Sequence, residues 1–146
     1  MESDLNKLTN EEFWKTITYF KPKEFSHPDK VSRQLIKNLD EYRKLVGKPI
    51  IIHSDYRPGD TGQHGKGLAI DFHVKGMNLM DQFLFAERTN LFTGIGVYPD
   101  WNNQGLHCDI RTEAKSRWGC WKVNGKQEYF ALDYEFFKKY YQKYGK

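Results

Sequence analysis

The chain lacks the segments that mark secreted and membrane proteins. Its 146 residues contain no apolar run that approaches the roughly 20 residues needed for a bilayer-spanning helix. The first residues, MESDLNKLTNEEF, lack the basic and then apolar pattern of a secretion signal. We therefore expect a cytoplasmic protein without a signal peptide and without a membrane partner.

Cysteine and clustered positive charge are also scarce. The two cysteines, Cys108 and Cys120, form no Cys-x-x-Cys pair and no disulfide framework, so two reduced thiols are expected. The net charge of +4 comes from single lysines and arginines scattered among acids. Because nucleic-acid binders usually carry a dense cationic stretch, we expect no nucleic-acid partner.

The sequence does contain enough apolar residues for one packed domain. Hydrophobic residues make up 38% of the chain and aromatic residues 16%, a content and length that support one core rather than two. No internal repeat, linker or low-complexity segment divides the chain. We expect residues 1–146 to form a single domain, and we expect that domain to be a monomer.

The hydrophobic pattern predicts helices at both ends of the chain and short strands between them. Thr9 and Glu12 form a capping-box pattern, typical of a helix start. Asn124-Gly125 lies between two alternating runs and indicates a hairpin. The expected helices cover about 10–20, 31–46, 78–90 and 134–144, and the other strands lie near 50–54 and in LAIDFHV, TGIGVYP and LHCDIR. This order predicts an α+β fold with a small, mainly antiparallel sheet flanked by helices.

Two of these strands carry polar residues on one face. Side chains alternate between the two faces of a strand. Asp71 therefore points away from the apolar face of LAIDFHV, and His107 and Asp109 point away from Cys108 in LHCDIR. A buried carboxylate needs a partner, and in a shared sheet Asp71 can meet His107 while His64 approaches from the glycine-rich loop. Three nitrogen and oxygen ligands, with a fourth position left to water, are typical of a catalytic zinc site.

The order of several motifs resembles a known family. The segments SDYRP, QHGKGLAID, GIGVYP, LHCDIR and RWG follow one another as they do in zinc peptidases of the M15 type. That family shares its fold with D-Ala-D-Ala carboxypeptidases and the hedgehog signalling domain. The resemblance runs from about Phe20 to Trp118 and is strongest to the small phage and bacterial branch, in which FKPKEF also recurs.

The resemblance implies roles for particular residues. It makes His64, Asp71 and His107 the ligands of a Zn²⁺ cofactor. It gives Arg57 a catalytic and substrate-binding role, holding the substrate and the developing oxyanion. Gln63 stands where a polar residue commonly precedes the first ligand, and we expect it to bind substrate. Apart from the resemblance, Tyr98 is a candidate substrate-binding residue in the wall of the cleft, with a place in the core as the alternative.

One departure from the family pattern concerns the general base. Several relatives place an acid three residues before the last zinc ligand, where this chain has Gln104, which cannot accept a proton. Asp109 shares a strand face with His107 and is the first candidate for the catalytic base. The same carboxylate can instead orient the ring of His107, and the sequence leaves both roles open.

The resemblance predicts a zinc-dependent peptidase that hydrolyses amide bonds in the peptide stems of bacterial peptidoglycan, as a phage or prophage endolysin does. Such a protein accumulates in the cytoplasm and acts on the cell wall after release. Which bond is cut, and whether the enzyme is a carboxypeptidase or an endopeptidase, depends on the shape of the pocket. The alternative is a zinc-binding interaction module of the same fold that lacks catalysis.

Overall fold

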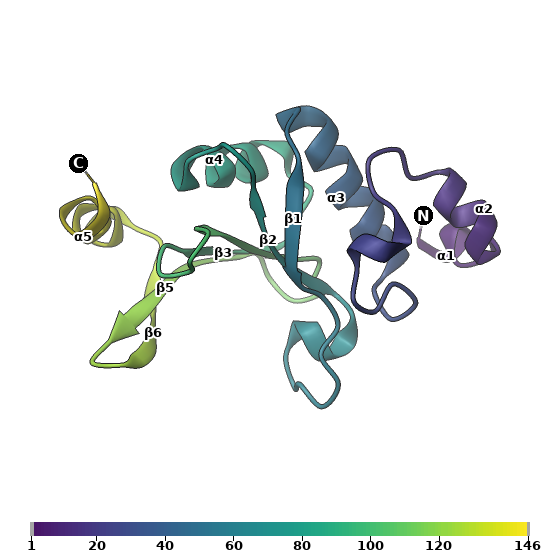
Figure 1. Cartoon of the computed structure of the whole chain (residues 1–146). Helices are drawn as coiled ribbons and strands as arrows, with labels where there is room; N and C mark the ends of the chain where they lie inside the picture. The colour runs from purple at the N-terminus through teal and green to yellow at the C-terminus, as the bar shows by residue number, and fades with distance from the viewer. Residues whose placement is uncertain (1, 146) are drawn as a thin grey trace.

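The computed structural model describes residues 2–145 and contains an open sheet with helices at its face and ends (Figure 1). Helices α1 to α5 cover Glu2–Leu5, Asn10–Lys15, Arg33–Val46, Leu79–Thr89 and Tyr134–Tyr144. Single 3-10 turns, η1 and η2, cover Pro22–Glu24 and Gln63–Lys66. Strands β1 to β6 cover Ile50–Ser54, Ala69–Val74, Gly94–Tyr98, Gly105–Asp109, Ser116–Val123 and Lys126–Ala131.

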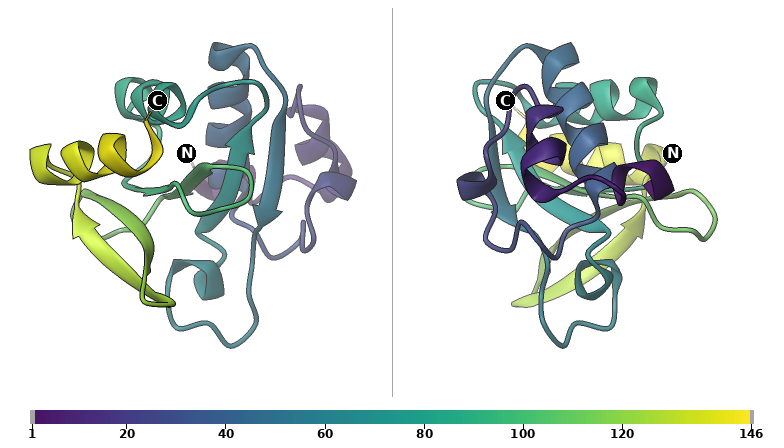
Figure 2. Two further views of the ribbon diagram at one scale, coloured as in Figure 1. Left: turned by 60° about the vertical axis from the view of Figure 1, so that its left-hand side comes forward. Right: turned by 90° about the vertical axis from the view of Figure 1, so that its right-hand side faces the viewer.

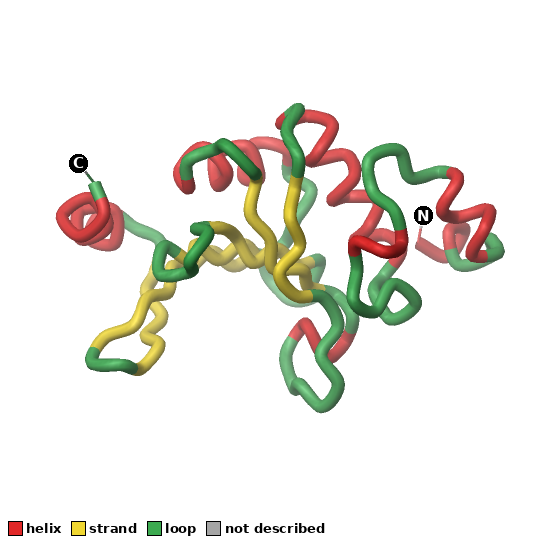
Figure 3. The backbone as a smooth tube through the Cα atoms, viewed as in Figure 1, coloured by secondary structure: helices red, strands yellow, loops and turns green. Residues whose placement is uncertain are grey.

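The six strands form one sheet in the order β1-β2-β4-β3-β5-β6. Every neighbouring pair is antiparallel except β3 and β5, which run parallel. The predicted α+β class with a mainly antiparallel sheet is therefore confirmed. Helices α3 and α4 lie on one side of the sheet, while the loop that carries η2 extends from the other side (Figures 1 and 3). The amino-terminal helices and α5 lie at opposite ends of the molecule (Figure 2).

The core lies between the sheet and helices α3 and α4. From the sheet it receives Ile70, Phe72 and Val74 of β2 and Leu106 and Cys108 of β4, all almost fully buried. Because side chains alternate along a strand, Asp71 and His107 point to the opposite face. The two are paired in the register of β2 and β4, so the strand pattern that builds the core also builds the site.

The predicted elements agree with the structure except at the end of the first helix. Thr9 and Glu12 form the expected capping box, but α2 ends at Lys15 rather than near residue 20. The backbone amides of Thr18 and Tyr19 donate instead to the Asp40 carboxylate of α3. Thr18 and Tyr19 are 22 and 21 residues from Asp40 in sequence, so local periodicity cannot reveal these contacts.

The predicted hairpin is present between β5 and β6. Asn124 and Gly125 adopt positive φ angles of 51° and 81°, as a two-residue hairpin turn requires. Strand β6 and helix α5 lie beyond the last of the motifs noted in the sequence, which ends within β5. Gln127 and Tyr129 of β6 nevertheless line the cleft described below, so the carboxyl-terminal segment contributes a wall to it.

Candidate metal centre

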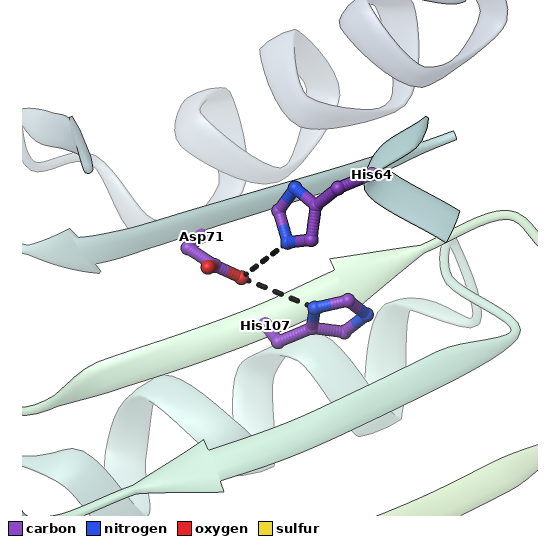
Figure 4. Close-up of side chains that lie close together, drawn as sticks. All are labelled: His64, Asp71 and His107. Carbon is purple, nitrogen blue, oxygen red and sulfur yellow. Dashed lines mark hydrogen bonds and ion pairs between the residues drawn. The ribbon is translucent and has the colours of Figure 1, made fainter. Parts of the chain in front are cut away.

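Three buried side chains from separate elements converge on one point (Figure 4). His64 comes from η2, Asp71 from β2 and His107 from β4. Oδ1 of Asp71 lies 3.0 Å from Nε2 of His64 and 3.1 Å from Nδ1 of His107. The predicted His-Asp-His set is therefore brought together, with one ligand atom from each residue within 4.8 Å of the others.

His64 is oriented by the main chain. Its Nδ1 lies 2.7 Å from the carbonyl oxygen of Asp55, which can only accept, so Nδ1 carries a proton and Nε2 is turned toward Asp71. The turn that holds His64 depends on glycines on either side of Lys66. A Cβ at Gly65 would lie 1.7 Å from the carbonyl oxygen of Asp60, and Gly67 has a positive φ of 72°.

His107 is oriented by a carboxylate. Its Nε2 donates to Oδ2 of Asp109 at 2.7 Å, which leaves Nδ1 free to face Asp71. Asp109 has no exposed surface, and the guanidinium of Arg111 holds both of its oxygens, at 2.9 and 2.7 Å. Burial raises the pKa of Asp109, but hydrogen bonds from His107 and Arg111 outweigh it and hold that pKa well below its usual range.

Asp71 is the centre of the group. Its Oδ2 accepts from Nη2 of Arg57 at 2.8 Å, so only Oδ1 faces the two histidines. Burial raises the pKa of Asp71, but hydrogen bonds to His107 and His64 outweigh it and keep the carboxyl ionised. Burial lowers the pKa of His107, while hydrogen bonds to Asp109 and Asp71 raise it above its ordinary value.

The point of convergence can hold a cation. With the outer nitrogens of His64 and His107 used as donors, both inner nitrogens face the ionised Oδ1 of Asp71. Such contacts are repulsive unless protons or a metal ion lie between the atoms. Two imidazole nitrogens and one carboxylate oxygen, each oriented by an outer hydrogen bond, form a donor set that suits zinc.

The three side chains lie at the floor of an open cleft of about 580 Å³. Aromatic rings form its walls, with Tyr98 stacked on Trp101 at 4.5 Å between centroids and Trp118 packed 5.1 Å from the ring of His107. Arg57 and Arg111 add positive charge to the lining. The predicted residues Arg57, Gln63 and Tyr98 all line this cleft.

Asp109 and Gln104, the two residues that the sequence analysis considers for the general base, both lie outside the cleft. Asp109 does not line the cleft, because its oxygens are occupied by His107 and Arg111 behind the ligand. Gln104 is turned away, with its amide donating to the carbonyl of Pro99. Asp109 therefore contacts the site through His107, as expected for the orienting role.

Sequence reasoning missed the glycines that make room for this arrangement. A Cβ at Gly94 would lie 2.4 to 2.6 Å from the carboxylate of Asp109, and one at Gly96 would lie 2.5 to 2.8 Å from the ring of Trp118. Both glycines are in the motif GIGVYP, from which the sequence analysis predicts a strand but assigns the glycines no role. Their signal was the repeated glycine within a strand, which often marks a close approach.

Comparison of the chain with protein-family models, curated proteins and solved structures finds no match. The resemblance to zinc peptidases thus depends on the motifs alone. Within residues 2–145, none of the helices combines the length and apolar character that a membrane-spanning segment requires.

Proposed function

We propose that this protein is a zinc-dependent peptidase that hydrolyses amide bonds in the peptide stems of bacterial peptidoglycan, with the fold of D-Ala-D-Ala carboxypeptidases and hedgehog domains. The observation that carries the proposal is the convergence of His64 Nε2, Asp71 Oδ1 and His107 Nδ1 at the floor of an open cleft. A zinc ion bound there supplies an activated water and a Lewis acid for an amide carbonyl. The motif resemblance supplies the substrate class, and with it action on the wall after release from the cytoplasm.

Arg57 has two functions in this proposal. Its Nη2 and Nε bind Oδ2 of Asp71 and Oγ of Ser54, which fixes the guanidinium beside the ligands. The side chain remains 46% exposed and lines the cleft, so its positive charge faces the place where the carbonyl oxygen becomes negative. A fixed cation at that place stabilises the transition state more than the ground state.

Asp109 acts in this proposal as a positioning residue for His107. A different carboxylate must then accept the proton of the nucleophile, and Asp60 is the one acidic side chain among the described cleft residues besides Asp71. Oδ1 of Asp60 accepts from the amide of Gly62, and Oδ2 lies 3.6 Å from Nη1 of Arg57. Asp60→Asn keeps the first contact and removes the charge, so we expect slower turnover at unchanged zinc affinity.

A second candidate function is a zinc-binding module without catalysis. The observation that favours it is the position of the two polar side chains nearest in sequence to His107. Gln104 is bonded to Pro99, and Asp109 is held by Arg111, so neither offers a proton acceptor to the cleft. A zinc site without a base loses about 10²–10⁴-fold in rate.

Digestion of purified peptidoglycan separates the two functions. The wild-type protein, the chelator-treated protein and His107→Ala are incubated with cell walls, and the released fragments are identified by mass spectrometry. Zinc-dependent release of stem-peptide fragments supports the peptidase and also identifies the bond that is cut. If the protein binds zinc and cell walls but releases no fragments, the interaction module is supported. If the protein shows neither fragment release nor binding, both proposed functions are overturned.

A further inference from the structure

A second pair of histidines lies on the same face of the sheet as the candidate metal centre. Nε2 of His53, in β1, is 2.6 Å from Nδ1 of His73, in β2, and the ring centroids are 4.9 Å apart. His53 is exposed and His73 is half-buried. Unlike the three buried ligands, this pair is therefore open to solvent.

The backbone brings the two rings together through a break in strand pairing. Strands β1 and β2 pair regularly from Ile50–Val74 to Ile52–Phe72, and then the register shifts so that Ser54 lies opposite Asp71. The shift leaves His53 as an extra residue, and such bulges bend a strand and redirect its side chains. The same shift sets Ser54 where its hydroxyl accepts from Arg57.

The surroundings of His53 are polar and open. It lines a hollow of about 420 Å³ next to the main cleft, and the two share Arg57, Asp71 and Trp101. The ring of Trp101 packs against His53 with centroids 5.1 Å apart, and the amides of Asn102 and Asn103 complete the hollow. An incoming ion can thus reach the pair and retain water molecules.

We propose that His53 and His73 form a second site for a borderline transition-metal ion, namely zinc, copper or nickel. Two imidazole nitrogens are the ligands that these ions prefer, whereas calcium and magnesium require oxygen. Among the described residues, no acid joins the pair at ligand distance, which excludes the hard cations. The site is separate from that of His64, Asp71 and His107 and does not depend on the peptidase function.

Binding requires a tautomer change and a small separation of the rings. In the hydrogen-bonded pair, one ring donates its proton to the facing nitrogen of the other. When an ion enters, that proton moves to the other nitrogen of the same ring, so no proton is lost from the pair. Tetrahedral Zn–N bonds of about 2.0–2.1 Å hold two nitrogens about 3.3 Å apart, a modest opening for an exposed side chain beside a bulge.

Metal stoichiometry tests the proposal without any measurement of activity. The chelator-stripped protein is dialysed against a series of free zinc concentrations, and bound zinc is measured. We expect a second equivalent to bind at higher free zinc than the first. His53→Gln and His73→Gln should each weaken the affinity for the second zinc ion at least tenfold and leave binding of the first unchanged. His107→Ala should abolish binding of the first zinc ion and leave binding of the second unchanged. Ile51→Ala, the neighbour opposite His73 in the register, should retain both.

Paramagnetic broadening identifies the atoms involved. With the first site filled by zinc, added Ni²⁺ should broaden the ring resonances of His53 and His73 before those of His27. A single equivalent at every zinc concentration that both glutamine variants retain would overturn the proposal, as would a second equivalent that survives in both glutamine variants. If the protein binds a single zinc ion and both glutamine variants lose it, the site at His53 and His73 is supported and the proposed buried zinc centre is rejected.

Discussion

Asp109 and Asp71 lie on opposite sides of the His107 ring, 2.7 Å from Nε2 and 3.1 Å from Nδ1 respectively. Because Nε2 donates to Asp109, the ring is fixed with Nδ1 toward the candidate metal position. We therefore expect Asp109→Asn to weaken zinc affinity by about 10- to 100-fold. Turnover of a stem peptide should recover when zinc is supplied in excess, which a zinc titration of both binding and rate will measure.

The outcome for Asp109→Asn also decides between the two roles that the sequence left open. Retained zinc affinity with turnover lowered by about 100-fold, a loss of about 2.7 kcal/mol, would assign the base role to Asp109. Glu113→Gln is the matched control, since Glu113 is an exposed acid that contacts Gln63 and not a ligand. It should leave zinc affinity unchanged.

The predictable parts of this site are those set by local pattern. Alternation along β2 and β4 places Asp71 and His107 on the face opposite the core, so their meeting requires only that the two strands pair. The parts that could not be predicted depend on distant contacts. Asp55 orients His64 through a carbonyl oxygen, which any residue possesses, so the residue type at position 55 carries no signal.

The same difference between local pattern and distant contact explains which helices and turns of the fold could be predicted. Helix α5 and the Asn124-Gly125 hairpin carry their signals within a few residues, and both lie where the sequence predicts them. Helix α2 stops early because the Asp40 carboxylate, from another helix, takes the amides of Thr18 and Tyr19. Tertiary hydrogen bonds of this kind override helical propensity.

Removal of any one proposed ligand should abolish tight zinc binding. His64→Ala, Asp71→Ala and His107→Ala each leave two ligands, and three-ligand sites rarely survive such a loss. Metal analysis after dialysis against low free zinc measures the effect. His73→Ala is the control, because it should retain the zinc ion bound by His64, Asp71 and His107. Full zinc content in His107→Ala would remove that residue from the ligand set.

Gly94→Ala should impair the metal centre by displacing the carboxylate behind it. The added methyl group would lie 2.4 Å from Oδ1 of Asp109, so the carboxylate that holds His107 must shift. We expect zinc affinity to fall by about tenfold or more, as for loss of the carboxylate itself. Isothermal titration with zinc measures this fall.

Gly119→Ala provides the comparison for that experiment. Its Cβ would lie 2.0 Å from the ring of Phe136, so it also strains the sheet, but against a side chain that is not one of the proposed ligands or their partners. It should lower the free energy of unfolding and leave the zinc affinity of the folded protein intact. Equal zinc affinity in the two variants would contradict the proposed role of Gly94.

The protein should remain folded without metal. Its core joins α3, α4 and the sheet through many fully buried apolar side chains, including Leu35, Phe72 and Ile95. A small zinc finger, by contrast, has almost no core and unfolds when its ion is removed. Far-ultraviolet circular dichroism in excess chelator should therefore retain its native shape. A random-coil spectrum would show that the ion is part of the folding free energy.

Glu87 and Arg117 predict a pH-dependent contribution to stability away from the metal centre. The Arg117 guanidinium donates to both oxygens of Glu87 at 2.9 Å and so joins α4 to β5. This hydrogen bonding lowers the pKa of Glu87 below its ordinary value of 4.5. The stabilisation is therefore fully present above pH 4.5 and is lost as the pH falls through the lower pKa of the folded state.

Glu87→Gln should accordingly lower the free energy of unfolding by about 1 kcal/mol at pH 7, and by progressively less as the pH falls below about 4. Urea unfolding of the chelated protein at pH 7, 5 and 3.5 measures the difference between wild type and variant. Glu11→Gln is the control, because Glu11 faces Lys15 with both side chains at least 75% exposed, and its effect should be near zero throughout. If the Glu87→Gln difference stays constant down to pH 3.5, the lost stability comes from packing and not from the carboxylate charge.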